Sequence, residues 1–208
     1  MSQVSNSSVE IQLPSELPLI VLSECFHFPG CFLPLYVFEQ KYRDMLKLAL
    51  ETHRMFGVGV RVQDDSDEIL PIVTVGLIRA CVTQQDGTSN VMLQGVKRMR
   101  ISGFTQTNPF KIASIEEPKC KEACPDRLAE LQQLAIKSLP RCPVGAEAAM
   151  AKLMTQLKEC NCPEATCDLL TYHFIRSGEM LAKSMTEACL VKRYELLISA
   201  LERFKSAV

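Results

Sequence analysis

The chain has 208 residues, which is enough for one large domain or two small ones. Apolar residues make up 47% and charged residues 23%, as in ordinary globular proteins, and this excludes disorder of the whole chain. The 23 basic residues nearly balance the 24 acidic ones, which argues against a dedicated nucleic-acid-binding protein because such proteins usually carry a strong basic excess.

The ten cysteines would indicate disulfides in a short secreted chain. Residues 1–10, however, contain no Lys or Arg, and Pro14, Pro18 and Glu24 interrupt the apolar stretch that follows. A signal peptide has a basic start and a continuous apolar run. No apolar run approaches the roughly 18 residues that a membrane span needs. We therefore expect a cytoplasmic protein with no membrane segment, whose cysteines are mostly reduced.

The first half of the chain is dominated by strand patterns. Alternating or continuous apolar runs predict strands at about 17–22, 31–36, 56–62, 69–82, 91–101 and 104–115. Asp86-Gly87 is typical of a tight hairpin. Between the second and third strands, apolar residues at spacings of three and four predict one helix that starts near Phe38, and we expect Phe38 to be buried where this helix meets the sheet. This half therefore predicts a small barrel or sandwich.

The second half is helical. Apolar stripes predict helices at about 125–138, 146–159 and 163–175, and a capping box at Ser184–Glu187 predicts the start of a last helix. The fold class is therefore α+β. We divide the chain into a disordered tail (1–12), a β-rich subdomain (13–118) and a helical subdomain (119–208).

Sequence signatures of common catalytic sites are missing. No glycine precedes a lysine, so there is no P-loop, and neither Gly-x-Ser-x-Gly nor Ser-x-x-Lys occurs. Cys160, Cys162 and Cys167 do not have the paired spacing of a zinc site. We predict no catalytic residues, no cofactor and no metal. One alternative stays open, a hydrolase whose Cys and His residues meet only in the folded chain.

Several motifs, taken together, closely resemble the N-terminal domain of Lon protease. They are Leu17-Pro18-Leu19, Phe28-Pro29-Gly30, LPLYVFE at 33–39, Tyr42-Arg43-Asp44-Met45, VGLI at 75–78 and LQGVKRMRI at 93–101. The resemblance extends from about residue 13 to 204. It implies a PUA-like β-rich subdomain packed on a helical one. In the protease, this domain precedes an ATPase module and a Ser–Lys peptidase domain, helps to select and hold unfolded or tagged substrates, and supports hexamer assembly.

Since neither later module is found in these residues, the resemblance predicts a non-catalytic substrate-recognition domain that binds unfolded or tagged polypeptide. It would act as an adaptor or chaperone-like holder, including beside a separate ATP-dependent protease. The alternative is an RNA-binding module that uses the PUA-like barrel, and a continuous basic surface would distinguish it. The sequence predicts no oligomeric state.

The candidate polypeptide-binding residues are Phe26, Phe28 and Phe32, which crowd a turn expected at the surface. The competing interpretation is that these rings fill the mouth of the barrel. A basic cluster follows Gly95, and alternate strand positions place Arg98 and Arg100 on one face. We expect these arginines to form structural ion pairs with carboxylates such as Glu39.

Overall fold

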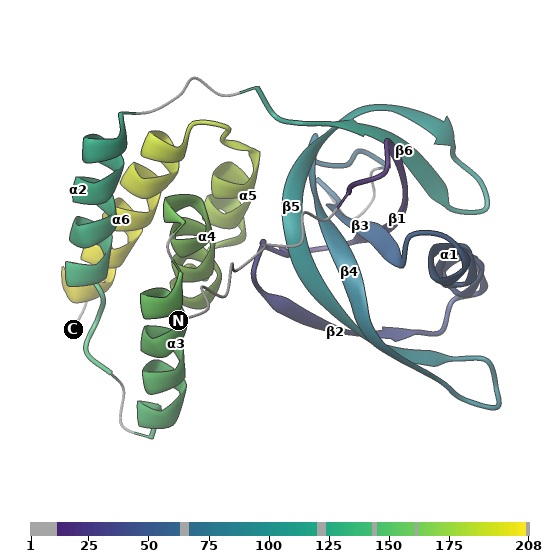
Figure 1. Cartoon of the computed structure of the whole chain (residues 1–208), viewed down its shortest axis with the longest axis horizontal. Coiled ribbons are helices and arrows are strands. Elements are labelled where there is room, and N and C mark those ends of the chain that lie inside the picture. Colours follow the sequence, from purple (N-terminus) through teal and green to yellow (C-terminus); the bar gives the residue numbers. More distant parts are fainter. Residues whose placement is uncertain (1–11, 63–66, 120–123, 143–144, 161, 207–208) are drawn as a thin grey trace, which may run out of the picture.

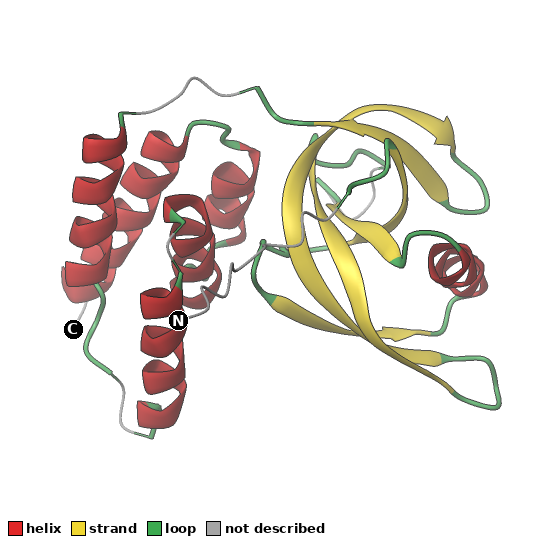
Figure 2. Cartoon of the chain, viewed as in Figure 1, coloured by secondary structure: helices red, strands yellow, loops and turns green. Residues whose placement is uncertain are grey.

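The protein is described by a computed structural model that covers residues 12–62, 67–119, 124–142, 145–160 and 162–206. A sheet with one helix beside it forms one part of the molecule, and five further helices pack together as the other part (Figures 1 and 2). Almost all of the predicted tail at 1–12 lies outside the described residues.

The sheet closes on itself. Its strands are β1 (Glu16–Leu22), β2 (Phe32–Val37), β3 (Met55–Val60), β4 (Ile72–Thr83), β5 (Ser89–Gln106) and β6 (Lys111–Glu116), in the order β2-β5-β4-β3-β1-β6. The 18-residue β5 pairs with β2 and β4 and, through its second half, also with β6, which completes a ring of β5, β4, β3, β1 and β6. The predicted six strands are confirmed, and β2 lies outside the ring.

Two glycines allow this path of the chain. Gly87 has a φ of +81° in the predicted β4–β5 hairpin, where the Asp86 carboxylate accepts a hydrogen bond from the Thr88 N–H at 2.9 Å. Gly95 lies against the turn before β2, and a Cβ atom there would be 2.2 Å from the Phe28 carbonyl oxygen. The ladder register shifts beside it, between Val75 and Gly76, which marks a β-bulge in β5.

Helix α1 (Gln40–Glu51) packs its apolar stripe on the outside of the closed sheet. Tyr42, Met45 and Ala49 are buried in a cluster that also contains residues of β1 and β3. Phe38 does not belong to this stripe, because the helix begins two residues later. Its side chain is 59% exposed, so the predicted burial of Phe38 is wrong.

The described residues of the second half form five helices rather than the four predicted. They are α2 (Pro125–Lys137), α3 (Glu147–Glu159), α4 (Pro163–Phe174), α5 (Gly178–Thr186) and α6 (Leu190–Ser206). The short α5 begins after Ser177, whose hydroxyl accepts a hydrogen bond from the Met180 N–H. The predicted capping box at Ser184–Glu187 is therefore wrong, because Ser184 lies buried in the last turn of α5 and α6 begins at Leu190.

Candidate functional site

An exposed apolar patch lies on the outward faces of β2, β4 and β5. We define the outer patch as Phe32, Pro34, Tyr36, Phe38, Val82 and Met92, all of which are exposed. Phe32, Tyr36 and Phe38 are 48%, 56% and 59% exposed, and large aromatic side chains rarely leave so much surface in water when they lie together.

The strand register makes the outer patch continuous. Pro34 lies opposite Met92, and Met92 lies opposite Ala80 on β4. Two residues further along β2, Tyr36 lies opposite Asn90 of β5, which in turn lies opposite Val82 of β4. Residues directly opposite on adjacent strands have side chains on the same face at about 5 Å, so these rows form one surface.

Side chains of β2 alternate between its two faces, and both faces are apolar because all six residues of the strand are apolar or aromatic. Leu33, Leu35 and Val37 point into the cluster shared with α1, which fixes Phe32, Pro34 and Tyr36 on the opposite, solvent-facing side. The Tyr36 ring continues the row by stacking on Phe38, with ring centroids 5.9 Å apart. No helix of the described chain covers this face of the strand, as the exposures of its side chains show.

The structure separates the three aromatic residues predicted to form a binding turn. Phe28 is fully buried with residues of the helical bundle, so its prediction as a surface-binding residue is wrong. The turn folds back on β5, since the Gly30 N–H donates to the Gly95 carbonyl at 2.9 Å, and this drives the Phe28 ring inward. Phe26 is half-buried against the bundle. Only Phe32 is fully part of the exposed surface, in the outer patch.

Sequence reasoning missed the rest of the outer patch. The signal was present, since Phe32, Pro34 and Tyr36 alternate with three aliphatic residues. A strand that is apolar at every position indicates burial on both faces or a surface for a partner.

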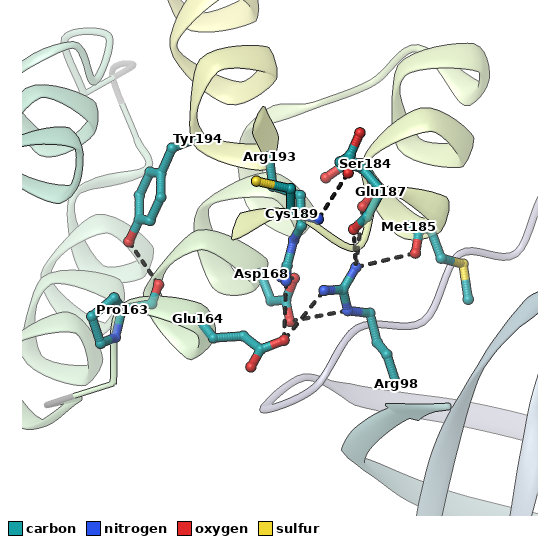
Figure 3. Close-up of polar contacts among 10 residues, drawn as sticks. All are labelled: Arg98, Pro163, Glu164, Asp168, Ser184, Met185, Glu187, Cys189, Arg193 and Tyr194. Atoms are coloured by element: carbon teal, nitrogen blue, oxygen red, sulfur yellow. Dashed lines mark hydrogen bonds and ion pairs between the residues drawn. The ribbon is translucent and has the colours of Figure 1, made fainter. Parts of the chain in front are cut away.

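A buried charged cluster connects the sheet to the helical bundle (Figure 3). Arg98 of β5 is only 6% exposed and reaches between α4 and α5. Its guanidinium donates to the Ser184 and Met185 carbonyls at 3.2 and 3.1 Å and to the Glu164 carboxylate at 3.2 Å. It also lies 3.8 Å from Asp168. Arg98 thus satisfies carbonyls at the end of α5 that have no partner within the helix.

A second arginine completes the cluster from the bundle side. Arg193 of α6 is 1% exposed, donates to Glu164 at 3.0 Å and forms an ion pair with Asp168. Two arginines therefore face two carboxylates. Burial raises the pKa of the Asp168 carboxyl to about 7, while the positive charge of Arg98 opposes this rise.

Arg98 forms the structural ion pairs that were predicted, but its partners are Glu164 and Asp168, and the predicted partner Glu39 is wrong. Glu39 instead forms an ion pair with Lys41 at 2.9 Å, at the start of α1. Arg100 is exposed, whereas Arg98 on the same face is covered by the helices. The sequence could not reveal this difference because the covering residues, Glu164 and Asp168, lie more than sixty positions away.

The thiols and imidazoles of the interior are poorly suited to catalysis. Burial, followed by the charge of Asp168, raises the pKa of the Cys31 thiol to about 12, and burial also raises the pKa of Cys167. Burial lowers the pKa of His27 to about 4, and its ring nitrogens have no hydrogen-bond partner among the described residues. A nucleophilic cysteine needs a lowered pKa. Burial here raises the pKa of both thiols and therefore disfavours the reactive thiolate.

Two further searches cover the part of the chain that the structure describes. No group of three or more His, Cys, Asp or Glu side chains in it is arranged to hold a metal ion. None of its helices has both the length and the apolar character required to cross a membrane.

Solved structures of similar fold are Lon N-terminal domains. The N-terminal domain of the Mycobacterium avium complex Lon protease superposes with a TM-score of 0.69 at 14% identity, covering 90% of this chain and 98% of that one. The Lon N-terminal domain protein from Xanthomonas campestris gives a TM-score of 0.60 at 19% identity, covering 89% and 98%. At these identities the comparisons establish the fold.

Sequence comparisons point in the same direction. The Lon protease of Flavobacterium johnsoniae is 28% identical over 159 residues, which are 70% of this chain and 20% of that protein. The Lon protease of Parabacteroides distasonis is 31% identical over 140 residues, which are 64% and 17%. The chain thus matches a fifth or less of the length of these relatives. The family model described as the ATP-dependent protease La (LON) substrate-binding domain matches residues 16–203. From its fold and from this match over nearly its whole length, the chain belongs to the family of LON substrate-binding domains.

Proposed function

We propose that this domain binds unfolded polypeptide at the outer patch. Membership of the LON substrate-binding domain family supports substrate recognition in general terms. The observation that carries the finer proposal is the row of exposed aromatic side chains formed by Phe32 and Tyr36 of β2 and by Phe38, which directly follows the strand. Unfolded chains differ from folded proteins chiefly in exposing apolar side chains, and aromatic rings that are already held in place bury them at a low entropic cost.

The electrostatics of the outer patch favour polypeptide over RNA. Its six members are uncharged, and the facing Ala80, Asn90 and Gln94 are uncharged as well. The basic cluster that follows Gly95 does not form a continuous basic surface either, because Arg98 is buried by the helices and unavailable to a phosphate. RNA binding needs cations along the path of the backbone. The outer patch lacks them.

The family relation supports two further proposals about role and partners. The domain would hold unfolded or tagged clients as an adaptor or chaperone-like protein, and it would work beside an ATP-dependent protease that supplies hydrolysis. The closed sheet supports a PUA-like barrel as its fold type. Free thiols at all nine described cysteines support a reducing compartment such as the cytoplasm.

The test is to measure binding of fluorescently labelled, reduced and carboxymethylated α-lactalbumin, which is permanently unfolded. Tyr36→Ser and Met92→Ser remove apolar side chains from the centre of the outer patch. Each should weaken binding by about tenfold, since central interface residues contribute more than about 1 kcal/mol.

Leu134→Ser is the matched control. Leu134 is 45% exposed on α2, comparable to Phe32, and it lies outside the outer patch. Its substitution should leave the affinity unchanged, and raising the salt concentration should not weaken binding. Equal binding by wild type and both outer-patch variants would refute the location of the site, and no binding by wild type would refute the proposed function.

A further inference from the structure

We infer that the client segment binds as an added β-strand along the free edge of β2. This inference rests on the proposed function and specifies how the site recognises its substrate. The outer patch lies on the face of β2, whereas the inference concerns the neighbouring edge, where backbone groups rather than side chains make the contact.

The edge of β2 is open among the described residues. β2 pairs with β5 on one side, is the first strand in the sheet order, and has no second neighbour there. It lies at the margin of the sheet, where it begins beside the helical bundle and runs away from it (Figure 1). An exposed edge carries a row of backbone donors and acceptors that can pair with another extended chain.

The hydrogen-bond parity shows which groups face outward. The Gly95 N–H donates to the Cys31 carbonyl at 2.9 Å, so the backbone polar groups of residue 31 point toward β5. In an antiparallel ladder, alternate residues exchange hydrogen bonds with the same neighbour. Residues 33, 35 and 37 therefore face β5, and Phe32, Pro34 and Tyr36 turn their backbone groups toward the open edge.

Pro34 makes this edge selective. It has no N–H, so the edge presents the N–H groups of Phe32 and Tyr36 and the carbonyls of Phe32, Pro34 and Tyr36. If two copies of β2 paired antiparallel so that the outward-facing residues 32, 34 and 36 of one copy lay opposite residues 36, 34 and 32 of the other, the two prolines would face each other, with no donor on either. The occupant that fits is therefore a different chain, one that donates opposite Pro34.

The outer patch then determines the side chains of that occupant. We infer an antiparallel strand, in which the residues that bond to Phe32, Pro34 and Tyr36 lie directly opposite them. Their side chains then lie on the same face as these residues and extend the apolar surface of the outer patch. Since β2 has six residues, the best client is an extended segment of similar length. It is uncharged, and its apolar residues occur at every second position.

The experiment uses a synthetic peptide, Lys-Lys-Thr-Val-Thr-Val-Thr-Val-Thr-Lys, and two N-methylated forms. In one form the three Val nitrogens are methylated, and in the other the nitrogens of the three Thr residues that each follow a Val. In strand addition the valine side chains extend the outer patch, and the valine N–H and C=O groups form hydrogen bonds with β2. We expect Val methylation to weaken binding by about tenfold or more, and Thr methylation to leave it close to that of the parent peptide.

Two variants provide a matched test in the protein. Tyr36→Ala and Tyr36→Pro both remove the ring, but only the proline removes an N–H from the open edge. The Tyr36→Pro variant should bind the parent peptide more weakly than Tyr36→Ala, while the circular dichroism of both remains that of wild type. Similar affinities for the two variants would contradict a role of the Tyr36 N–H.

The remaining outcomes separate this inference from the proposed function. If the two methylated peptides bind equally, or if the parent peptide fails to bind while unfolded α-lactalbumin still binds, strand addition is overturned and the proposed function stands. If α-lactalbumin fails to bind as well, the proposed function falls. A dimer that Tyr36→Pro dissociates and Tyr36→Ala does not would assign the edge to a second copy, against the inference.

Discussion

Replacement of Arg98 tests how the two parts of the molecule are held together. Arg98→Gln shortens a side chain that is 6% exposed and that donates to two carbonyls of α5 and to Glu164. Glutamine has no charge and cannot span the same distance, so the carbonyls lose their donor and Asp168 keeps only Arg193 as a cationic partner.

The expected loss follows from the cost of breaking a buried ion cluster on one side. Removing one partner of a buried pair costs about 3–5 kcal/mol, because the remaining charge stays buried without compensation. For a chain of this size each kcal/mol corresponds to about 2–4 °C. The melting temperature of Arg98→Gln should therefore fall by about 6–20 °C.

The loss should also depend on pH with a definite sign. Burial raises the pKa of folded Asp168 to about 7, above the roughly 3.9 of an unfolded aspartate, so its protonation favours the folded state and this contribution declines as pH rises toward 7. Arg98 opposes that rise, so its removal raises the folded pKa further. The variant should thus be closest to wild type near pH 5 and furthest from it near pH 8.

Urea unfolding of both proteins at pH 5, 7 and 8 measures these differences. Arg100→Gln is the control, because Arg100 lies two positions along the same face of β5 and is exposed. It should change the free energy of unfolding by less than about 0.5 kcal/mol. Equal effects of the two substitutions, or an Arg98→Gln loss that shrinks as pH rises, would refute this account of the cluster.

The other predictions concern packing and thiol chemistry. Phe38→Ala should lower the free energy of unfolding in urea by less than about 1 kcal/mol because the ring is exposed, whereas Phe28→Ala should lower it by about 3–5 kcal/mol. The reverse order would show that the burial of the two rings is misassigned. Gly95→Ala should lower the free energy of unfolding by about 1–3 kcal/mol, since its Cβ would clash with the Phe28 carbonyl oxygen. Gly103→Ala should lower it less, because no atom lies within 4 Å of the position of its Cβ. Equal losses of stability in the two variants would contradict this reasoning. Iodoacetamide at pH 8 should leave Cys31 unmodified until urea is added, although exposed thiols such as Cys124 and Cys142 react. Rapid alkylation of Cys31 itself in the native protein, identified by peptide mass spectrometry, would contradict its raised pKa.

Local patterns in the sequence predicted most of the elements. The alternation of apolar residues located six strands, and Asp86-Gly87 located the hairpin, because both signals depend on neighbours in the chain. The short helix α5 was missed, since its nine residues carry too few turns for a clear stripe and Ser184–Glu187 imitates a helix start.

Long-range packing was not accessible in the same way. Phe28 and Phe32 lie four positions apart in one aromatic segment, yet one is buried and the other exposed, because the contact of the turn with Gly95 decides which ring turns inward. Likewise, Arg98 and Arg100 have the same strand parity but different surroundings. Such differences depend on which distant helix covers a face, and no local pattern encodes that.

Hydrogen–deuterium exchange of the protein with and without unfolded α-lactalbumin tests the central claim most directly. The account predicts that binding slows exchange in peptides spanning 32–38 and 80–94, with the amide of Tyr36 among the protected groups, and leaves α2 to α6 unchanged. Protection confined to the helical bundle, or none at β2 while the polypeptide is bound, would contradict it.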